Sequence, residues 1–111
     1  MNTYVKAAVM QDFTSKHLKV VNLDGIEIVL FYVSEKVFAI ENLCPHQLFS
    51  VFHQGILDGY TITCPMHSWK FDLRTGKAVV GSGRVKTFEV KIDGKDILIK
   101  KSDSNQSFSQ F

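Results

Sequence analysis

The stretch 20-VVNLDGIEIVLFY-32 consists of two apolar, largely β-branched runs on either side of an Asp-Gly pair. Asp24-Gly25 readily supplies the positive φ angles that a tight two-residue turn needs. Val20–Leu23 and Ile26–Tyr32 have the length and composition of strands. The stretch therefore predicts an antiparallel β-hairpin. One face of the second strand is expected to hold its alternating apolar residues, Ile26, Ile28 and Leu30.

Asp-Gly pairs recur at two later points of the chain. Asp58-Gly59 precedes the short run Tyr60–Cys64, and Asp93-Gly94 separates Lys86–Ile92 from Ile97–Lys100. Helix signals are weak, because no long window keeps a 3.6-residue apolar period free of Gly-containing turns. The sequence therefore predicts an all-β domain of several short antiparallel strands.

The length and composition of the chain are those of an ordinary globular protein. Its 111 residues are 45% hydrophobic and 22% charged, which favours one folded domain, expected over residues 1–101. Residues 102–111 are rich in Ser and Gln and contain no Lys or Arg, so we expect a flexible C-terminal tail there.

Charge and hydropathy argue against several classes of protein. Thirteen Lys and Arg stand against eleven Asp and Glu without a long basic run, which gives no sign of nucleic-acid binding. The longest apolar stretch, Ile26–Val33, is far shorter than the roughly 20 residues of a membrane helix. The N-terminus lacks the features of a signal peptide, and two cysteines are too few for a secreted disulfide scaffold. The sequence favours a cytoplasmic protein that binds neither nucleic acid nor membrane.

Two short segments each pair one cysteine with one histidine. The segment 41-ENLCPHQ-47 contains Cys44 and His46, and 63-TCPMHSW-69 contains Cys64 and His67, with seventeen residues between His46 and Cys64. Both cysteines of the chain and two of its four histidines lie here. Thiolate and neutral imidazole are ligands of zinc and of iron–sulfur centres, whereas magnesium and calcium prefer oxygen. These four side chains are therefore the candidate metal ligands.

Zinc and an iron–sulfur cluster differ in the spacing that they favour. The usual structural zinc sites place two Cys close together and two His close together. Here each segment mixes one Cys with one His. A two-iron cluster needs this mixture if one iron binds both sulfurs and the other binds both imidazoles. A zinc-stabilised binding module without a redox role remains the less favoured alternative.

The spacing C-x-H, seventeen residues, C-x-x-H resembles that of Rieske [2Fe–2S] proteins. The likeness extends to Glu41–Leu43, to Ser68–Leu73 and to Thr75–Lys77, which flank the two segments. It implies a Rieske fold of stacked antiparallel sheets, with a small two-loop cluster-binding subdomain at about residues 42–76. From about residue 4 to residue 100 the order of expected elements is compatible with this fold.

The resemblance also implies one Rieske-type [2Fe–2S] cluster and the role of each ligand. Cys44 and Cys64 would bind a buried iron, while His46 and His67 would bind an outer iron near the surface. Two neutral imidazoles in place of two thiolates leave the cluster with less negative charge, which raises its potential above that of an all-cysteine cluster.

The residues around the ligands indicate which kind of Rieske protein this sequence resembles. Respiratory members carry a disulfide between the loops, and a Ser and a Tyr that hydrogen-bond the cluster and a ligand sulfur. This chain has Phe49, Met66, Trp69 and Phe71 at those positions. Without these donors the reduced cluster is less stabilised, so we expect a potential toward the low end of about −150 to +300 mV.

Other positions depart from the usual pattern of the family. Leu48 and Ser68 stand where a Gly is common, and 81-GSGR-84 stands where Pro residues often cover the cluster. The Gly-rich cover is expected to be more mobile than a Pro-rich one.

The expected function is one-electron transfer, with no catalytic residue. The remaining histidines, His17 and His53, are expected to be solvent-facing or loop residues, and no length remains for the catalytic domain of an oxygenase. The resemblance implies a Rieske ferredoxin, such as the ferredoxin component of a multicomponent dioxygenase, that carries electrons from a reductase to a terminal oxygenase or another oxidoreductase. A small Rieske subunit of a larger redox enzyme, like that of nitrite reductase, stays open as an alternative.

Overall fold

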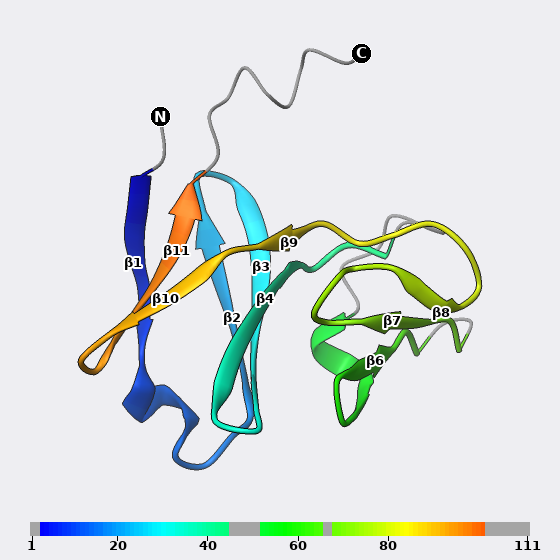
Figure 1. The fold of residues 1–111 in the computed structure, drawn as a ribbon, viewed down its shortest axis with the longest axis horizontal. Helices are drawn as coiled ribbons and strands as arrows, with labels where there is room; N and C mark the ends of the chain where they lie inside the picture. The colour runs from blue at the N-terminus through cyan, green and yellow to red at the C-terminus, as the bar shows by residue number, and fades with distance from the viewer. Residues whose placement is uncertain (1–2, 45–51, 66–67, 102–111) are drawn as a thin grey trace.

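A computed structural model describes residues 3–44, 52–65 and 68–101 of the chain (Figure 1). This part contains eleven β-strands and two short 3-10 helices, η1 and η2, and no α-helix. The strands form three antiparallel sheets. The predicted all-β architecture of stacked antiparallel sheets is confirmed.

Each of the three sheets is named here by its place in the fold. The terminal sheet has the order β1-β11-β10, the central sheet β2-β3-β4-β9, and the small sheet β5-β6-β7-β8. The elements are β1 (Thr3–Val9), η1 (Met10–Phe13), β2 (Leu18–Leu23), β3 (Ile26–Val33), β4 (Lys36–Glu41), η2 (Phe52–Gln54), β5 (Ile56–Asp58), β6 (Thr61–Thr63), β7 (Lys70–Asp72), β8 (Ala78–Val80), β9 (Thr87–Phe88), β10 (Val90–Asp93) and β11 (Asp96–Lys101).

The predicted turns lie where the Asp-Gly pairs are. Asp24 and Gly25 have φ angles of 55° and 86°, and they join β2 to β3 in the hairpin predicted from the sequence. Gly59 and Gly94 also have positive φ angles, in the turns between β5 and β6 and between β10 and β11. Two adjacent positive φ angles give a turn whose twist matches that of the paired strands, which explains the first hairpin.

The prediction of a single strand over Lys86–Ile92 is wrong, because the structure divides this segment between two sheets. β9 pairs with β4 in the central sheet, and β10 pairs with β11 in the terminal sheet. The change occurs at Glu89, whose carbonyl accepts a hydrogen bond from the Lys100 amide at 2.9 Å. In Figure 1 the chain passes from one sheet to the other between β9 and β10. The alternating apolar pattern persists through both strands and does not reveal the change of partner.

The central sheet is the middle layer of the fold. Ile28 and Leu30 share one face of β3 as predicted, and they pack in one core with residues of the terminal sheet such as Ile97. Val29 and Phe31 face the other way and are also completely buried. A strand covered on both faces shows a continuous apolar run, which is what 28-IVLF-31 is.

The second core lies between the central and small sheets and contains both cysteines. Burying each large apolar side chain contributes about 1.5–3 kcal/mol, so this core fixes the small sheet against the central one. Its buried members are Val29, Phe31, Ile40, Cys44, Phe52, Ile62, Cys64, Phe71, Leu73 and Val85.

Candidate metal centre

The two predicted sulfur ligands lie in the same buried core. Cys44 follows the end of β4 by three residues and is 1% exposed, and Cys64 directly follows β6 and is 0% exposed. The two thiols are not joined in a disulfide. His46 and His67, the predicted imidazole ligands, lie outside the described residues, as do Phe49 and Met66. The structure therefore places two of the four predicted ligands and brings both into one apolar environment.

The loop after Cys64 is closed by its own backbone. The amide of Cys64 donates to the carbonyl of Trp69 at 2.7 Å, and the amide of Ser68 donates to the carbonyl of Cys64 at 3.0 Å. β6 and β7 continue the pairing outward from this point, with Thr63 opposite Lys70. The chain thus leaves and returns to the small sheet beside Cys64, which fixes the backbone of this ligand.

Ser68 occupies a backbone conformation that favours glycine. Its φ angle is 61°, in the left-handed region, and its position is one where Gly is common in Rieske proteins. A serine can adopt this conformation, at a cost that glycine does not have. Ser68 therefore adopts a backbone conformation that a glycine would reach at lower cost.

Asn42 anchors the first loop at both of its ends. Its side chain is 1% exposed, and its amide nitrogen donates to Glu27 Oε1 at 3.3 Å and to His53 Nδ1 at 3.0 Å. Its Oδ1 accepts from the backbone amide of His53 at 3.3 Å, and its own backbone amide donates to the Glu27 carbonyl at 2.8 Å. Asn42 lies two residues before Cys44, and its buried side chain thus connects β3 to η2, which follows the loop.

The two histidines outside the Cys/His segments have different surroundings. His17 is exposed, as predicted. His53 is half-buried, and because Asn42 Oδ1 faces its backbone amide, the Asn42 NH₂ group faces its Nδ1. In this arrangement the ring Nδ1 accepts the hydrogen bond from the Asn42 amide group. No sequence pattern predicts this contact, because the two residues are eleven positions apart and neither is hydrophobic.

The turn after β7 is held by an ion pair and a glycine. Asp72 accepts from the backbone amide of Arg74 at 2.8 Å and from its guanidinium Nε and Nη2 at 3.1 and 2.9 Å. The Arg74 side-chain hydrogen bonds lower the pKa of the Asp72 carboxyl from its ordinary value of 3.8. The guanidinium also stacks on the Tyr60 ring at 4.5 Å. Gly76 follows with a φ angle of 81°, and a Cβ there would lie 2.3 Å from the Val85 carbonyl oxygen.

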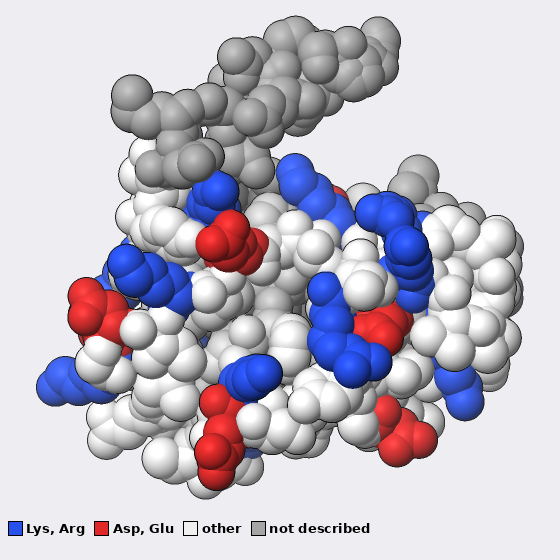
Figure 2. All heavy atoms as spheres, in the orientation of Figure 1, with Lys and Arg blue, Asp and Glu red and all other residues white. Residues whose placement is uncertain are grey.

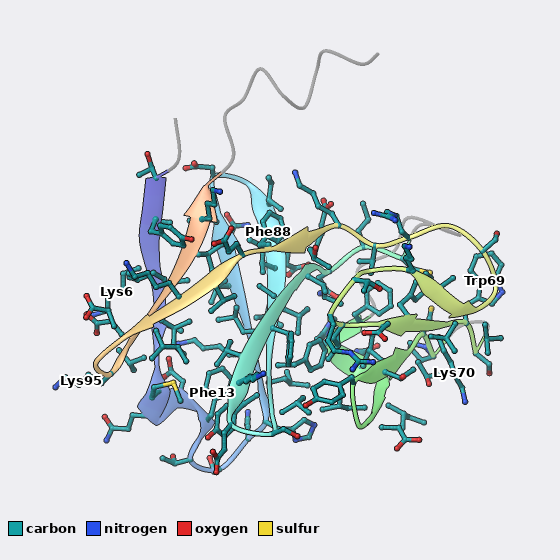
Figure 3. The ribbon with its side chains drawn as sticks, viewed as in Figure 1. Lys6, Phe13, Trp69, Lys70, Phe88 and Lys95 are labelled. Carbon is teal, nitrogen blue, oxygen red and sulfur yellow. The ribbon has the colours of Figure 1, made fainter. Side chains whose placement is uncertain are left out.

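Trp69 and Phe71 pack near Cys64. Phe71 is completely buried and makes an edge contact with Phe52, their ring centroids 5.6 Å apart. The half-buried Trp69 ring lies 6.4 Å from that of Phe71 and directly over Gly81, where an added Cβ would be 2.3 Å from the indole. Figure 3 shows Trp69 at the end of the small sheet that is farthest from the terminal sheet. The predicted mobility of the Gly-rich cover remains a prediction.

The residues present fit a mixed-ligand iron–sulfur cluster. Two buried thiols supply the sulfur half of the donor set, in an apolar core that also contains Phe31, Phe52 and Phe71. Each cysteine is followed within three residues by a predicted histidine ligand. Within the described ranges, which omit His46 and His67, no group of three or more His, Cys, Asp or Glu could hold a metal ion. Nor does that part of the chain contain a helix long and apolar enough to cross a membrane.

Comparison with known proteins gives a consistent result. A sequence profile of the Rieske [2Fe-2S] domain matches residues 3–90. The ferredoxin component of the naphthalene 1,2-dioxygenase/salicylate 5-hydroxylase systems of Ralstonia sp. is 33% identical over 99 residues, which cover 87% of this chain and 94% of the relative.

Solved structures of similar size share the fold. The ferredoxin of carbazole 1,9a-dioxygenase from Nocardioides aromaticivorans IC177 matches with a TM-score of 0.80 at 29% identity, covering 87% of this chain and 96% of that one. A chain in the complex of reduced oxygenase and oxidised ferredoxin of carbazole 1,9a-dioxygenase matches with a TM-score of 0.78 at 25% identity, covering 90% and 97%. The chain therefore belongs to the Rieske [2Fe-2S] domain family, and its cofactor is one Rieske-type [2Fe–2S] cluster.

Proposed function

We propose that this protein is a one-electron carrier, the ferredoxin component of a multicomponent dioxygenase system. The observation that carries the proposal is the match to a dioxygenase ferredoxin component over 94% of that relative's length. The relative is a carrier component of its system, and this chain matches it almost from end to end. The protein thus carries electrons between enzymes and has no catalytic residue of its own.

The four ligands are assigned as predicted from the sequence. Cys44 and Cys64 bind the inner iron, and the burial of both sulfurs supports this assignment. His46 and His67 bind the outer iron. When bound, the cluster accepts and releases one electron at a time. The Asn42 side chain holds the ends of the first loop, and the backbone hydrogen bonds of Cys64 with Ser68 and Trp69 hold the second. Burial keeps water from the sulfurs.

The partners in this proposal are a reductase that supplies the electron and a terminal oxygenase that receives it. A ferredoxin has been observed in complex with the oxygenase of carbazole 1,9a-dioxygenase, and a chain of that complex shares this fold. We place the protein in the cytoplasm, where such a carrier can meet both enzymes. The nitrite-reductase-like alternative is less well supported, because relatives above 30% identity are dioxygenase components.

A purified holoprotein tests the proposal directly. A reductase and a terminal oxygenase of a naphthalene 1,2-dioxygenase system are mixed with NADH, with and without this protein, and substrate turnover is measured. We expect turnover to depend on the protein and to stop when Cys64→Ser replaces it. A protein that accepts electrons from dithionite but supports no turnover with any dioxygenase system, and that elutes only as a subunit of a larger enzyme, would contradict the carrier function.

A further inference from the structure

The end of the molecule that carries the Cys/His segments has an excess of positive charge. Residues 45–88 contain five Lys or Arg and two Asp or Glu, whereas residues 3–44 and 89–101 together contain eight of each. One of the two acids, Asp72, is already bound by Arg74. Figure 2 shows Lys and Arg side chains spread over the end formed by the small sheet. The modest net charge of the chain therefore hides a strong local asymmetry.

Two of these cations lie opposite each other. Lys77 and Arg84 are partners in an antiparallel bridge, and both are exposed. Like charges directly across a bridge are destabilising. Neither side chain forms an ion pair with any other described residue, and the same holds for Lys70 on β7. Two like charges that repel each other within the fold are more readily explained by a partner that neutralises them.

Two exposed valines lie between Lys77 and Arg84 along the chain. Val79 is 60% exposed and Val80 is 48% exposed, on β8, the edge strand of the small sheet. Val80 is the pairing partner of Lys70. Exposed apolar side chains surrounded by charged ones are the usual composition of a protein-binding surface.

This surface adjoins the second ligand loop. Lys70 directly follows Trp69, whose carbonyl accepts the amide hydrogen bond of Cys64. Gly81 directly follows Val80 and lies against the Trp69 indole. Figure 3 places Trp69 and Lys70 together at the outer end of the small sheet. A partner seated here is therefore close to the cluster loops.

We propose that Lys70, Lys77 and Arg84, with Val79 and Val80 between them, form a docking face for a carboxylate-rich surface of a redox partner protein. The proposal rests on the proposed carrier function and adds the sign of the partner's charge. Exposed charges of one sign raise association rates with oppositely charged partners, by factors of about 10 to 1,000, and the effect falls with added salt. A nucleic acid is a poorer fit, because the basic residues are few and flank exposed valines.

The test uses the reduced holoprotein and two small oxidants of opposite charge, the ferricyanide anion and the tris(phenanthroline)cobalt(III) cation. In each reaction one electron passes from the reduced cluster to the metal of the oxidant. Stopped-flow absorbance gives the two rate constants, and their ratio cancels changes in driving force. The variant is Lys77→Glu with Arg84→Glu, which keeps a pair of like charges across the bridge.

The matched control is Lys16→Glu with Lys36→Glu. Both lysines are exposed and come before the small sheet in the sequence, and the double substitution changes the net charge by the same amount. At low ionic strength we expect the ferricyanide-to-cobalt rate ratio to fall at least about threefold further in the docking-face variant than in the control. At 0.5 M salt the two variants should agree. Equal ratios in both variants at low salt would overturn the proposal.

The class of partner is tested by competition. Poly-L-glutamate should slow ferricyanide oxidation of the natural protein and have a weaker effect on the docking-face variant. Single-stranded DNA that competes more strongly than poly-L-glutamate at equal charge would overturn the assignment to a protein partner. A preparation that holds no cluster would contradict the proposed function itself, before any variant is compared.

Discussion

Asn42 connects three parts of the chain around the first cysteine. Each polar atom of its side chain has a partner, and the residue is almost completely buried. Such a residue stabilises the fold only while all of its partners are present, because a buried polar group without a partner loses its hydrogen bonds to water and gains none in the protein. Its effect therefore reaches the ligand loop through geometry rather than through contact with the cluster.

Asn42→Ala should lower the free energy of unfolding by about 1–3 kcal/mol, since it leaves Glu27 and His53 without this donor. Urea unfolding of the holoprotein measures the change. The control is Asn22→Ala, which removes a single exposed hydrogen bond to the Gly25 amide. Equal losses of unfolding free energy in the two variants would contradict a larger stabilising effect of the buried hydrogen bonds.

Gly81 and Gly83 separate two effects of a glycine. Both have φ angles near 90°, but a Cβ at Gly81 would meet the Trp69 indole at 2.3 Å, and one at Gly83 would meet nothing within 4 Å. Gly83→Ala should cost roughly 1–2 kcal/mol for backbone strain alone. Gly81→Ala should cost more and shift the emission of Trp69, the single tryptophan. Unchanged emission in Gly81→Ala would contradict the packing described.

Phe71 tests the expectation of a low potential. Its ring is completely buried in the core that holds both cysteines. Phe71→Tyr adds a hydroxyl donor there, and a hydrogen bond to a ligand sulfur stabilises the reduced cluster. We expect the reduction potential to rise, as measured by a redox titration. Phe13→Tyr, in the other core, is the control and should leave the potential unchanged. A lower potential in Phe71→Tyr would contradict the explanation.

The elements differ in how far their sequence determined them. The β2–β3 hairpin was predictable because Asp24-Gly25 specifies its turn locally. The division of Lys86–Ile92 into β9 and β10 was not, because the change of sheet depends on which strand lies alongside. The contact of Asn42 with His53 was not predictable for the same reason, because it depends on which segments the fold brings together. The candidate ligands could be named from the sequence, since the chain has only two cysteines and each is close to a histidine. The structure brings Cys44 and Cys64 into one core, and the roles of His46 and His67 stay predictions.

The turn after β7 makes a prediction about pH. Because the Arg74 hydrogen bonds lower the pKa of Asp72 in the folded protein, the carboxylate stabilises the fold above its ordinary pKa of 3.8. This contribution is lost as the pH falls through the lower value in the folded state. The stability difference between the natural protein and Asp72→Asn should therefore be constant near neutral pH and shrink below pH 4. Urea unfolding at a series of pH values measures it.

Arg74→Gln supplies the control for this prediction. It removes the same guanidinium contacts, so adding it to Asp72→Asn should change the stability little further. Two fully additive losses would contradict the ion pair as the cause.

On the scale of the whole molecule, the central sheet separates two cores, and one of them contains both cysteines. One core joins it to the terminal sheet, and the other holds Cys44 and Cys64 between the central and small sheets. Cluster binding therefore stabilises the second core directly, since a ligand that binds only the folded state shifts the unfolding equilibrium.

Removing the cluster should lower the melting temperature by ~5 °C or more. The loss should be uneven: amides of β6 and β7 should exchange faster in the apoprotein, while those of β1 and β11 keep their protection. Hydrogen exchange followed by mass spectrometry compares the two sheets. An equal increase in both would contradict the division of the molecule into two cores.

The central claim is that Cys44, His46, Cys64 and His67 together bind one [2Fe–2S] cluster. EPR of the anaerobically purified, dithionite-reduced protein, with metal analysis of the same sample, tests it most directly. We expect two irons per chain, an average g value below that of an all-cysteine cluster, and loss or conversion of this spectrum in His46→Ala and Cys64→Ser. Zinc without iron, or an unchanged spectrum in either variant, would contradict it.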